Sequence, residues 1–127
     1  MKTSFDPRHQ KRVAVMQEIF AWQFQKDTAL KTETAKELAQ NLDEIDLEIT
    51  KAAPAWPIEQ INKVDLAILR LAVFELIIVK DAPFKVIVDE AVELAKEFGT
   101  ESSPTFINGA LGNLINSKKI DQKEKNV

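Results

Sequence analysis

The chain has 127 residues, of which 45% are hydrophobic and 29% are charged, and it contains no cysteine. This length is enough to bury a hydrophobic core, so we expect a single domain over residues 1–127. The lack of cysteine excludes disulfides, thiolate metal sites and a cysteine nucleophile. Residues 1–12 lack the apolar core of a signal peptide, and we therefore expect a cytoplasmic protein.

The formal net charge of −3 argues against a protein that is basic overall. The charge is unevenly distributed, because residues 1–26 contain five basic and two acidic side chains, a net +3, and the remainder carries −6. A basic end on an acidic body can bind a polyanion locally. Simple solvation of these basic residues is the alternative that charge alone leaves open.

The predicted elements are helices, and the first begins at Asp6-Pro7, an N-cap side chain followed by proline. Apolar residues then recur at helical spacing. A second amphipathic helix is predicted from the capping-box pair Thr34 and Glu37 through Ile49. It ends at the segment APAWPIEQ, because two prolines three residues apart do not fit inside one helix.

The segment VDLAILRLAVFELIIV, residues 64–79, is apolar except for Asp65, Arg70 and Glu75. It is too short and too charged to span a bilayer, which takes about 20 mostly apolar residues. Charges five residues apart lie about 140° apart around a helix, so no polar face remains and the segment is predicted to be a buried central helix. We expect Arg70 to be neutralised by groups inside the protein, and Glu75 to point away from it.

Two further helices are predicted after residue 83. The segment FKVIVDEAVELAKEFG ends at Gly99, and the next helix starts at a serine cap followed by Pro104. Gly109 and Gly112 lie within this last helix, at a cost of about 1 kcal/mol each relative to alanine, which suggests close packing or access to a ligand. Residues 1–6 and 118–127 are expected to be flexible. The predicted architecture is an all-α bundle.

Patterns typical of enzymes are missing. His9 is the single histidine, so a histidine-based metal site or a Ser-His-Asp triad is not expected. Neither a phosphate-binding loop nor a dinucleotide fingerprint occurs in the sequence. We therefore expect no catalysis, no cofactor and no metal.

Three segments in the order VDLAILRLAVFEL, APFKVIVDEAVELAKEFG and FINGAL resemble the C-terminal half of the NusB family of bacterial transcription antitermination factors. RVAVMQEIFAWQF resembles the first helix of that family. The resemblance covers about residues 7–26 and 56–116. Residues 27–55 match only as a generic helix and are shortened, which leaves open whether a helix is missing or merged there.

The resemblance implies an all-α, NusB-like fold of two packed three-helix bundles without enzymatic activity. It further implies binding of a single-stranded RNA element called boxA, found in nascent transcripts such as ribosomal RNA leaders. The family binds this RNA as a heterodimer with a small-subunit ribosomal protein, NusE. Together the two proteins join an RNA polymerase elongation complex that suppresses premature termination.

The site residues of the family carry over where the sequence matches its motifs, which are the basic segment PRHQKR, the turn PFKV and the segment FING. The resemblance assigns RNA binding to nine residues: Arg8, His9, Lys11, Arg12, Phe20, Lys85, Phe106, Asn108 and Gly109. It assigns Asp65 to the contact with the ribosomal protein. Three positions depart from the family, because Phe20 replaces a frequent tyrosine, and Ser102 and Gly112 replace residues that are often acidic.

These residue types agree with single-strand recognition, in which basic side chains contact the backbone and aromatic rings stack on bases. Alternatives remain for several residues: core packing for Phe106, a helix cap or interhelix hydrogen bond for Asn108, and solvation for Arg8 and Arg12. For the whole chain, one alternative is a helical protein-interaction module without RNA binding. Another is the RNA-binding module of a ribosomal RNA cytosine methyltransferase, which would need a separate enzyme subunit.

Overall fold

The computed structural model describes residues 6–125, which form helices and turns with no strand among them. The helices are α1 (Pro7–Phe24), α2 (Glu33–Gln40), α3 (Leu42–Ala52), α4 (Lys63–Phe74), α5 (Phe84–Phe98), α6 (Ser103–Lys118) and α7 (Ile120–Lys125). A short 3-10 helix, η1 (Ile58–Gln60), precedes α4, and a π-helical turn, η2 (Glu75–Val79), continues it. The predicted all-α fold is confirmed.

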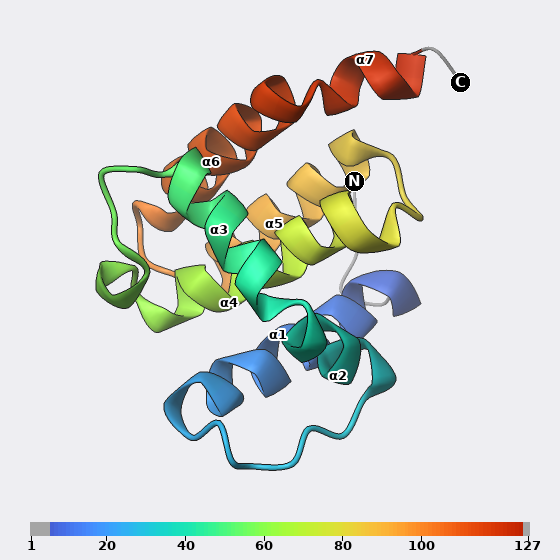
Figure 1. Ribbon diagram of the computed structural model, residues 1–127. Coiled ribbons are helices and arrows are strands. Elements are labelled where there is room, and N and C mark those ends of the chain that lie inside the picture. The colour runs from blue at the N-terminus through green and yellow to red at the C-terminus, as the bar shows by residue number, and fades with distance from the viewer. Residues whose placement is uncertain (1–5, 126–127) are drawn as a thin grey trace.

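Helix α4 is the centre of the fold and contacts α1, α2, α3, α5 and α6. Figure 1 shows α1 and α2 along the lower side of the molecule, and α6 and α7 along the upper edge. Every residue from Asp65 to Phe74 is buried, which confirms the predicted buried central helix. None of the described helices combines the length and the hydrophobicity that a bilayer span requires.

The charges on the central helix are neutralised by other helices. The Arg70 guanidinium donates to both carboxylate oxygens of Asp46 on α3, at 3.0 and 2.9 Å, and to Gln23 Oε1 on α1 at 3.0 Å. Glu75 does not pair with Arg70 but with Arg12 on α1, at 2.7 Å. Both expectations for these charges are confirmed, and the ion pairs link α1 and α3 to α4.

The middle of the chain differs from its prediction, because the expected single helix is two short helices that meet at Asn41. Asn41 Nδ2 donates to the carbonyl of Glu37 at 2.8 Å and closes α2. The N-cap of α2 is Thr32, not Thr34, and the Thr32 hydroxyl accepts from the Ala35 N–H at 3.1 Å. The predicted capping box was wrong because a tertiary contact selects the earlier threonine.

That tertiary contact comes from Glu18 on α1. Its carboxylate accepts hydrogen bonds from the Thr32 hydroxyl, at 2.8 Å, and from the Lys31 N–H. Burial raises the pKa of Glu18, but these hydrogen bonds outweigh it, so that the net shift is downward. The start of α2 is therefore anchored to α1 by a side chain 14 residues earlier in the chain.

The ends of the remaining helices agree in part with expectation. Asp6 caps α1, its carboxylate accepting from the Arg8 N–H at 2.9 Å. The expected serine cap of α6 makes no capping bond; Ser103 Oγ instead accepts from the Thr100 N–H at 2.9 Å. The tail that was expected to be flexible forms α7, where Glu124 accepts from the Phe84 N–H at 3.0 Å. Residues 1–5 and 126–127 lie outside the described part of the chain.

Replacing Arg70 by methionine tests how strongly the fold depends on this buried charge. The Arg70 side chain is 4% exposed, and its removal leaves Asp46 without its ion-pair partner. We expect the free energy of unfolding to fall by about 3 kcal/mol, measured by urea denaturation. Lys51→Met on the exposed surface of α3 is the control, expected to change it by less than about 0.5 kcal/mol. Equal effects of the two substitutions would contradict the structural role of Arg70.

Candidate RNA interface

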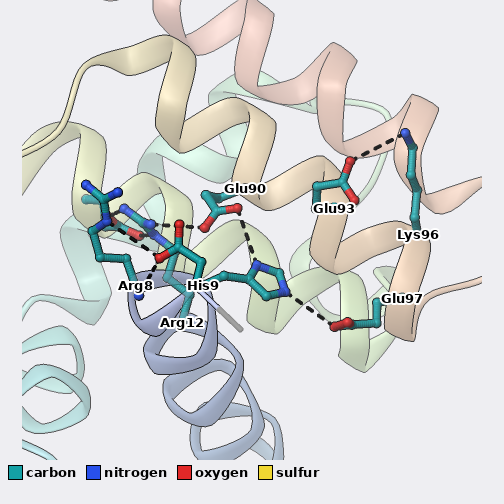
Figure 2. Close-up of polar contacts among 9 residues, drawn as sticks. Arg8, His9, Arg12, Glu90, Glu93, Lys96 and Glu97 are labelled. Atoms are coloured by element: carbon teal, nitrogen blue, oxygen red, sulfur yellow. Dashed lines mark hydrogen bonds and ion pairs between the residues drawn. The ribbon is translucent and has the colours of Figure 1, made fainter. Parts of the chain in front are cut away.

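The fold divides the basic segment at the start of α1 into two exposed cations and two side chains that are buried or partly buried. The Arg8 side chain is 86% exposed, and Lys11 is exposed as well. His9 and Arg12, in contrast, turn toward α5 (Figure 2). The segment therefore presents fewer free charges than its sequence suggests.

His9 lies between two carboxylates of α5. Its Nδ1 is 3.3 Å from Glu90 Oε2 and its Nε2 is 3.6 Å from Glu97 Oε2 (Figure 2). His9 is only 7% exposed, although it lies between the exposed Arg8 and Lys11 in the sequence. The physical reason is Glu90, a carboxylate that is itself buried and requires donors inside the protein. Whether His9 also contacts RNA stays a prediction.

Arg12 forms a bidentate pair with Glu75, in which Nε and Nη2 donate at 2.8 and 2.7 Å. Its Nη1 donates to Glu90 at 3.2 Å. The hydrogen bonds to Glu75 raise the pKa of Arg12, although burial acts in the opposite direction. The simple solvation considered for Arg12 is therefore wrong. Its guanidinium fastens α1 to the end of α4 and to α5, and it faces inward.

The exposed cations border a groove of about 650 Å³ between α1, α2 and the turn that joins α4 to α5. Arg8 and Lys11 are on its wall, together with the exposed apolar side chains of Val79 and Val86. Lys85, also exposed, precedes Val86 at the start of α5. Carboxylates of Asp6, Glu37 and Asp81 line the same groove, so its charge is mixed.

On α6 the structure separates residues that the sequence places close together. Phe106 packs edge-on against Trp56, with ring centroids 6.3 Å apart. Asn108 is two residues later, about 200° around the helix, and lines a second recess with Glu93 and Lys96 of α5. Among the described residues its amide has no hydrogen-bond partner, so neither a helix cap nor an interhelix bond occupies it.

Two aromatic side chains that the sequence did not assign to the site are exposed. Trp56, between two prolines in the segment before η1, is 50% exposed. Phe24, at the end of α1, is 63% exposed and lies edge-on to Phe20, at 5.1 Å between ring centroids. In the sequence, each could have been found as an aromatic residue near the end of a predicted helix. Gly109 has open space where a Cβ would be, so it leaves the surface of α6 bare.

Asp65, assigned to the ribosomal-protein contact, points into the protein and is 6% exposed. Asn62 caps α4 by accepting from the Asp65 N–H at 2.8 Å, and its amide donates to the Asp65 carboxylate at 3.2 Å. Burial raises the pKa of Asp65, and hydrogen bonding from Ser103 and Asn62 counters this only in part. The partner contact of Asp65 stays a prediction.

Comparison with known proteins identifies the family to which this helical scaffold belongs. The model of the NusB family matches residues 9–116, and the chain belongs to the NusB family. Among curated relatives, the NusB protein of Chloroflexus aggregans is 46% identical over 84 residues, covering 65% of this chain and 55% of its own length. That of Dehalococcoides mccartyi is 48% identical over 88 residues, covering 69% and 62%.

Solved structures extend the similarity to the whole fold. T. maritima NusB is 33% identical, with a TM-score of 0.78, over 96% of this chain and 99% of that chain. A complex of the antitermination factors NusB and NusE with double-stranded RNA shows the same fold at 22% identity, with a TM-score of 0.74 over 88% and 99% of the two chains. The first curated relatives are matched over 55% to 59% of their lengths.

Replacing Arg12 and Arg8 in turn by methionine separates the inward cation from the exposed one. Arg12→Met leaves Glu75 without its bidentate partner, and we expect the free energy of unfolding to fall by about 3 kcal/mol. Arg8→Met, at the same helix end, should change it by less than about 0.5 kcal/mol. Urea denaturation measures both values. A larger loss for Arg8 than for Arg12 would contradict the positioning role of Arg12.

The raised pKa of Asp65 predicts a pH-dependent effect of Asp65→Asn. Because the folded-state pKa lies above the unfolded value of about 3.9, ionisation costs stability once the pH exceeds that value. The neutral asparagine escapes this cost, so its melting temperature should gain on the wild type from pH 4 to pH 7. Thermal melts at several pH values measure the difference, with Asp43→Asn on exposed α3 as control. A gain that shrinks with rising pH would refute the assignment.

Proposed function

We propose that this protein is an RNA-binding transcription antitermination factor. In this proposal it binds boxA-type single-stranded RNA, pairs with the ribosomal protein NusE, and joins an RNA polymerase elongation complex. The function is non-enzymatic and is exercised in the cytoplasm, where bacterial transcripts are made.

Membership in the NusB family over residues 9–116 is the observation on which the proposal rests. The curated relatives are named as transcription antitermination proteins. One structure with this fold contains NusB together with NusE and RNA, and it supplies the partner that we propose for this chain. The likeness to T. maritima NusB along nearly the whole of both chains supports a scaffold with the same backbone fold.

The proposed RNA contacts follow from exposure and charge. Arg8, Lys11 and Lys85 are exposed cations suited to phosphates, and Asn108 is an exposed amide suited to a base edge. Gly109 lets a ligand approach the backbone of α6. Two aromatic residues of the nine assigned to RNA binding remain. We propose that Phe106 supports Trp56, which it contacts edge-on, and that the partly buried Phe20 stacks on a base.

In this proposal His9 and Arg12 do not contact RNA but hold the start of α1 in place. Their contacts with Glu90, and that of Arg12 with Glu75, hold the first turns of α1 against α5 and so set the direction in which Arg8 and Lys11 point. Because these contacts reduce the positive charge that is free to bind RNA, they also favour a second candidate function. This is a protein-interaction module of the same fold without RNA binding. Asp65 at the start of α4 is our proposed contact with NusE in either case.

A titration of labelled boxA-type RNA, with and without NusE, tests the proposed function. If Arg8, Lys11 and Lys85 each contact a phosphate, affinity should fall about 18-fold between 50 and 200 mM salt, from a slope of about −0.7 per contact. The double variant Arg8→Ala, Lys11→Ala should bind more weakly and lose about two-thirds of this salt dependence.

Lys51→Ala, which removes an exposed lysine from α3, is the control and should bind as the wild type does. The absence of sequence-preferring binding in both conditions would contradict the proposal. NusE binding that persists in a protein unable to bind RNA would support the protein-interaction module instead.

A further inference from the structure

The recess between α5 and α6 combines apolar surface with several polar side chains. Its volume is about 600 Å³, which is within the range of pockets that hold small molecules. Val92 of α5 and Pro104 of α6 supply the apolar part, and the other side chains of the lining are charged or polar. Among the described residues, none lines both this recess and the groove beside Arg8 and Lys11, so the two are separate sites.

Two lysines of α5 flank the recess on one face of the helix. Lys85, Asp89 and Lys96 lie within about 40° of one another around the helix axis, because their spacings are close to whole turns. Asp89 and Lys96 line the recess, and Lys85 is one turn before it. Both lysines are exposed, and they are about 17 Å apart along the axis. Since Lys85 is already a proposed phosphate contact, the recess adjoins the proposed RNA interface.

The charges inside the recess favour a neutral ligand group over a phosphate. Lys96 lies 3.7 Å from Glu93, and the two side chains are 59% and 48% exposed (Figure 2). Ion pairs this exposed are weak, so both groups can turn toward a ligand at little cost. Asp89 adds a second carboxylate, and the lining therefore has one more carboxylate than ammonium groups. A phosphate is repelled from such a lining.

The α6 wall of the recess supplies groups that both donate and accept hydrogen bonds. Thr105 and Asn108 line this wall, and both are exposed. Within residues 6–125, neither the Thr105 hydroxyl nor the Asn108 amide has a hydrogen-bond partner. Gly112 follows Asn108 by one helical turn, and a Cβ at Gly112 would meet nothing within 4 Å. The surface of α6 beside the amide is therefore open to a ligand.

We propose that the recess between α5 and α6 holds one base of the RNA, a base with an exocyclic amino group, and that Lys85 and Lys96 contact the phosphates on either side of it. Glu93 accepts a hydrogen bond from the amino group, and Asn108 bonds to the remaining edge of the base. The inference rests on the proposed function and adds Glu93 and Lys96 to its site.

A base has the chemistry that this lining can recognise. Its flat faces suit the apolar surface of Val92 and Pro104, and its polar edge suits the Asn108 amide, which has donors and an acceptor. A carboxylate only accepts hydrogen bonds, so Glu93 favours a base that donates from an amino group. Uracil has no amino group, and the recess therefore discriminates against it.

The position of the recess favours RNA over a protein partner. Lys85 on one side of it and Asn108 in its wall both belong to the residues proposed to bind RNA. A single strand that satisfies these two residues passes over the recess between them. Single-strand recognition also requires this combination of cations for the backbone with separate groups for the bases.

Glu93→Gln tests the selection of the base. A fluorescein-labelled boxA-type RNA is changed to uracil one position at a time, and the affinity of each RNA is measured. For the wild type we expect one position with an amino-bearing base at which uracil weakens binding about tenfold. With Glu93→Gln, which removes the charge and keeps the shape, this penalty should fall to about twofold, while the penalties elsewhere stay as they are. Glu44→Gln on exposed α3 is the matched control and should retain every penalty.

Two further variants locate the base and the phosphate. Asn108→Ala should reduce the uracil penalty at the same RNA position as Glu93→Gln, because both side chains contact one base. Lys96→Gln should weaken all of the RNAs alike and make the salt slope shallower by about 0.7, the value for one phosphate contact. Thermal melts check that every variant is folded.

The outcomes separate this inference from the proposed function. If the wild type shows no sequence-preferring binding, with or without NusE, both are overturned. If the wild type prefers a sequence but Glu93→Gln leaves every penalty unchanged, or shifts all RNAs by one factor, the inference alone is overturned. It is also overturned if Glu93→Gln and Asn108→Ala act at different RNA positions. Weaker NusE binding by Glu93→Gln in the absence of RNA would overturn it too, because the recess would then be a protein contact.

Discussion

The burial of α4 is the constraint on which the other elements of this fold depend. A helix surrounded by others cannot leave a charge unpaired, because desolvation of an isolated ion costs far more than a folded domain can offset. Arg70 therefore requires Asp46, and Glu75 requires Arg12. Each pair joins α4 to a helix distant in sequence, so the same interactions that make burial tolerable also set the register of α1 and α3 against the centre.

Much of this arrangement can be predicted from sequence, and the exceptions share a physical cause. The charges at Asp65, Arg70 and Glu75 predicted burial because their spacing leaves no polar face, and local signals located the cap at Asp6. The start of α2 was mispredicted, since Glu18 stabilises an earlier cap through a tertiary contact. The inward turn of His9 and Arg12 likewise depends on carboxylates of other helices, whose positions no local pattern contains.

The division of the basic segment reduces the positive charge that is free to bind a ligand. Two of its four basic side chains, His9 and Arg12, contact carboxylates of other helical elements, and they hold the helix end from which Arg8 and Lys11 project. A helix end that is already held in place loses less backbone freedom on binding than a flexible segment does. The candidate surface thus carries less free charge than the sequence suggests, and the backbone beneath it is held by contacts with α5 and with Glu75.

The π-turn at the end of α4 makes the path to α5 sensitive to the length of the chain. The Lys80 N–H donates to the Glu75 carbonyl at 2.9 Å, a span one residue longer than in an α-helix. Removing one residue from this turn would restore α-helical winding and rotate the following segment by about 100° around the axis of α4. Glu90 would then swing away from Arg12. At a helix junction of this kind, an insertion or deletion changes the rotation of α5 about the axis of α4. The orientation of α1, which contacts both elements, would change with it.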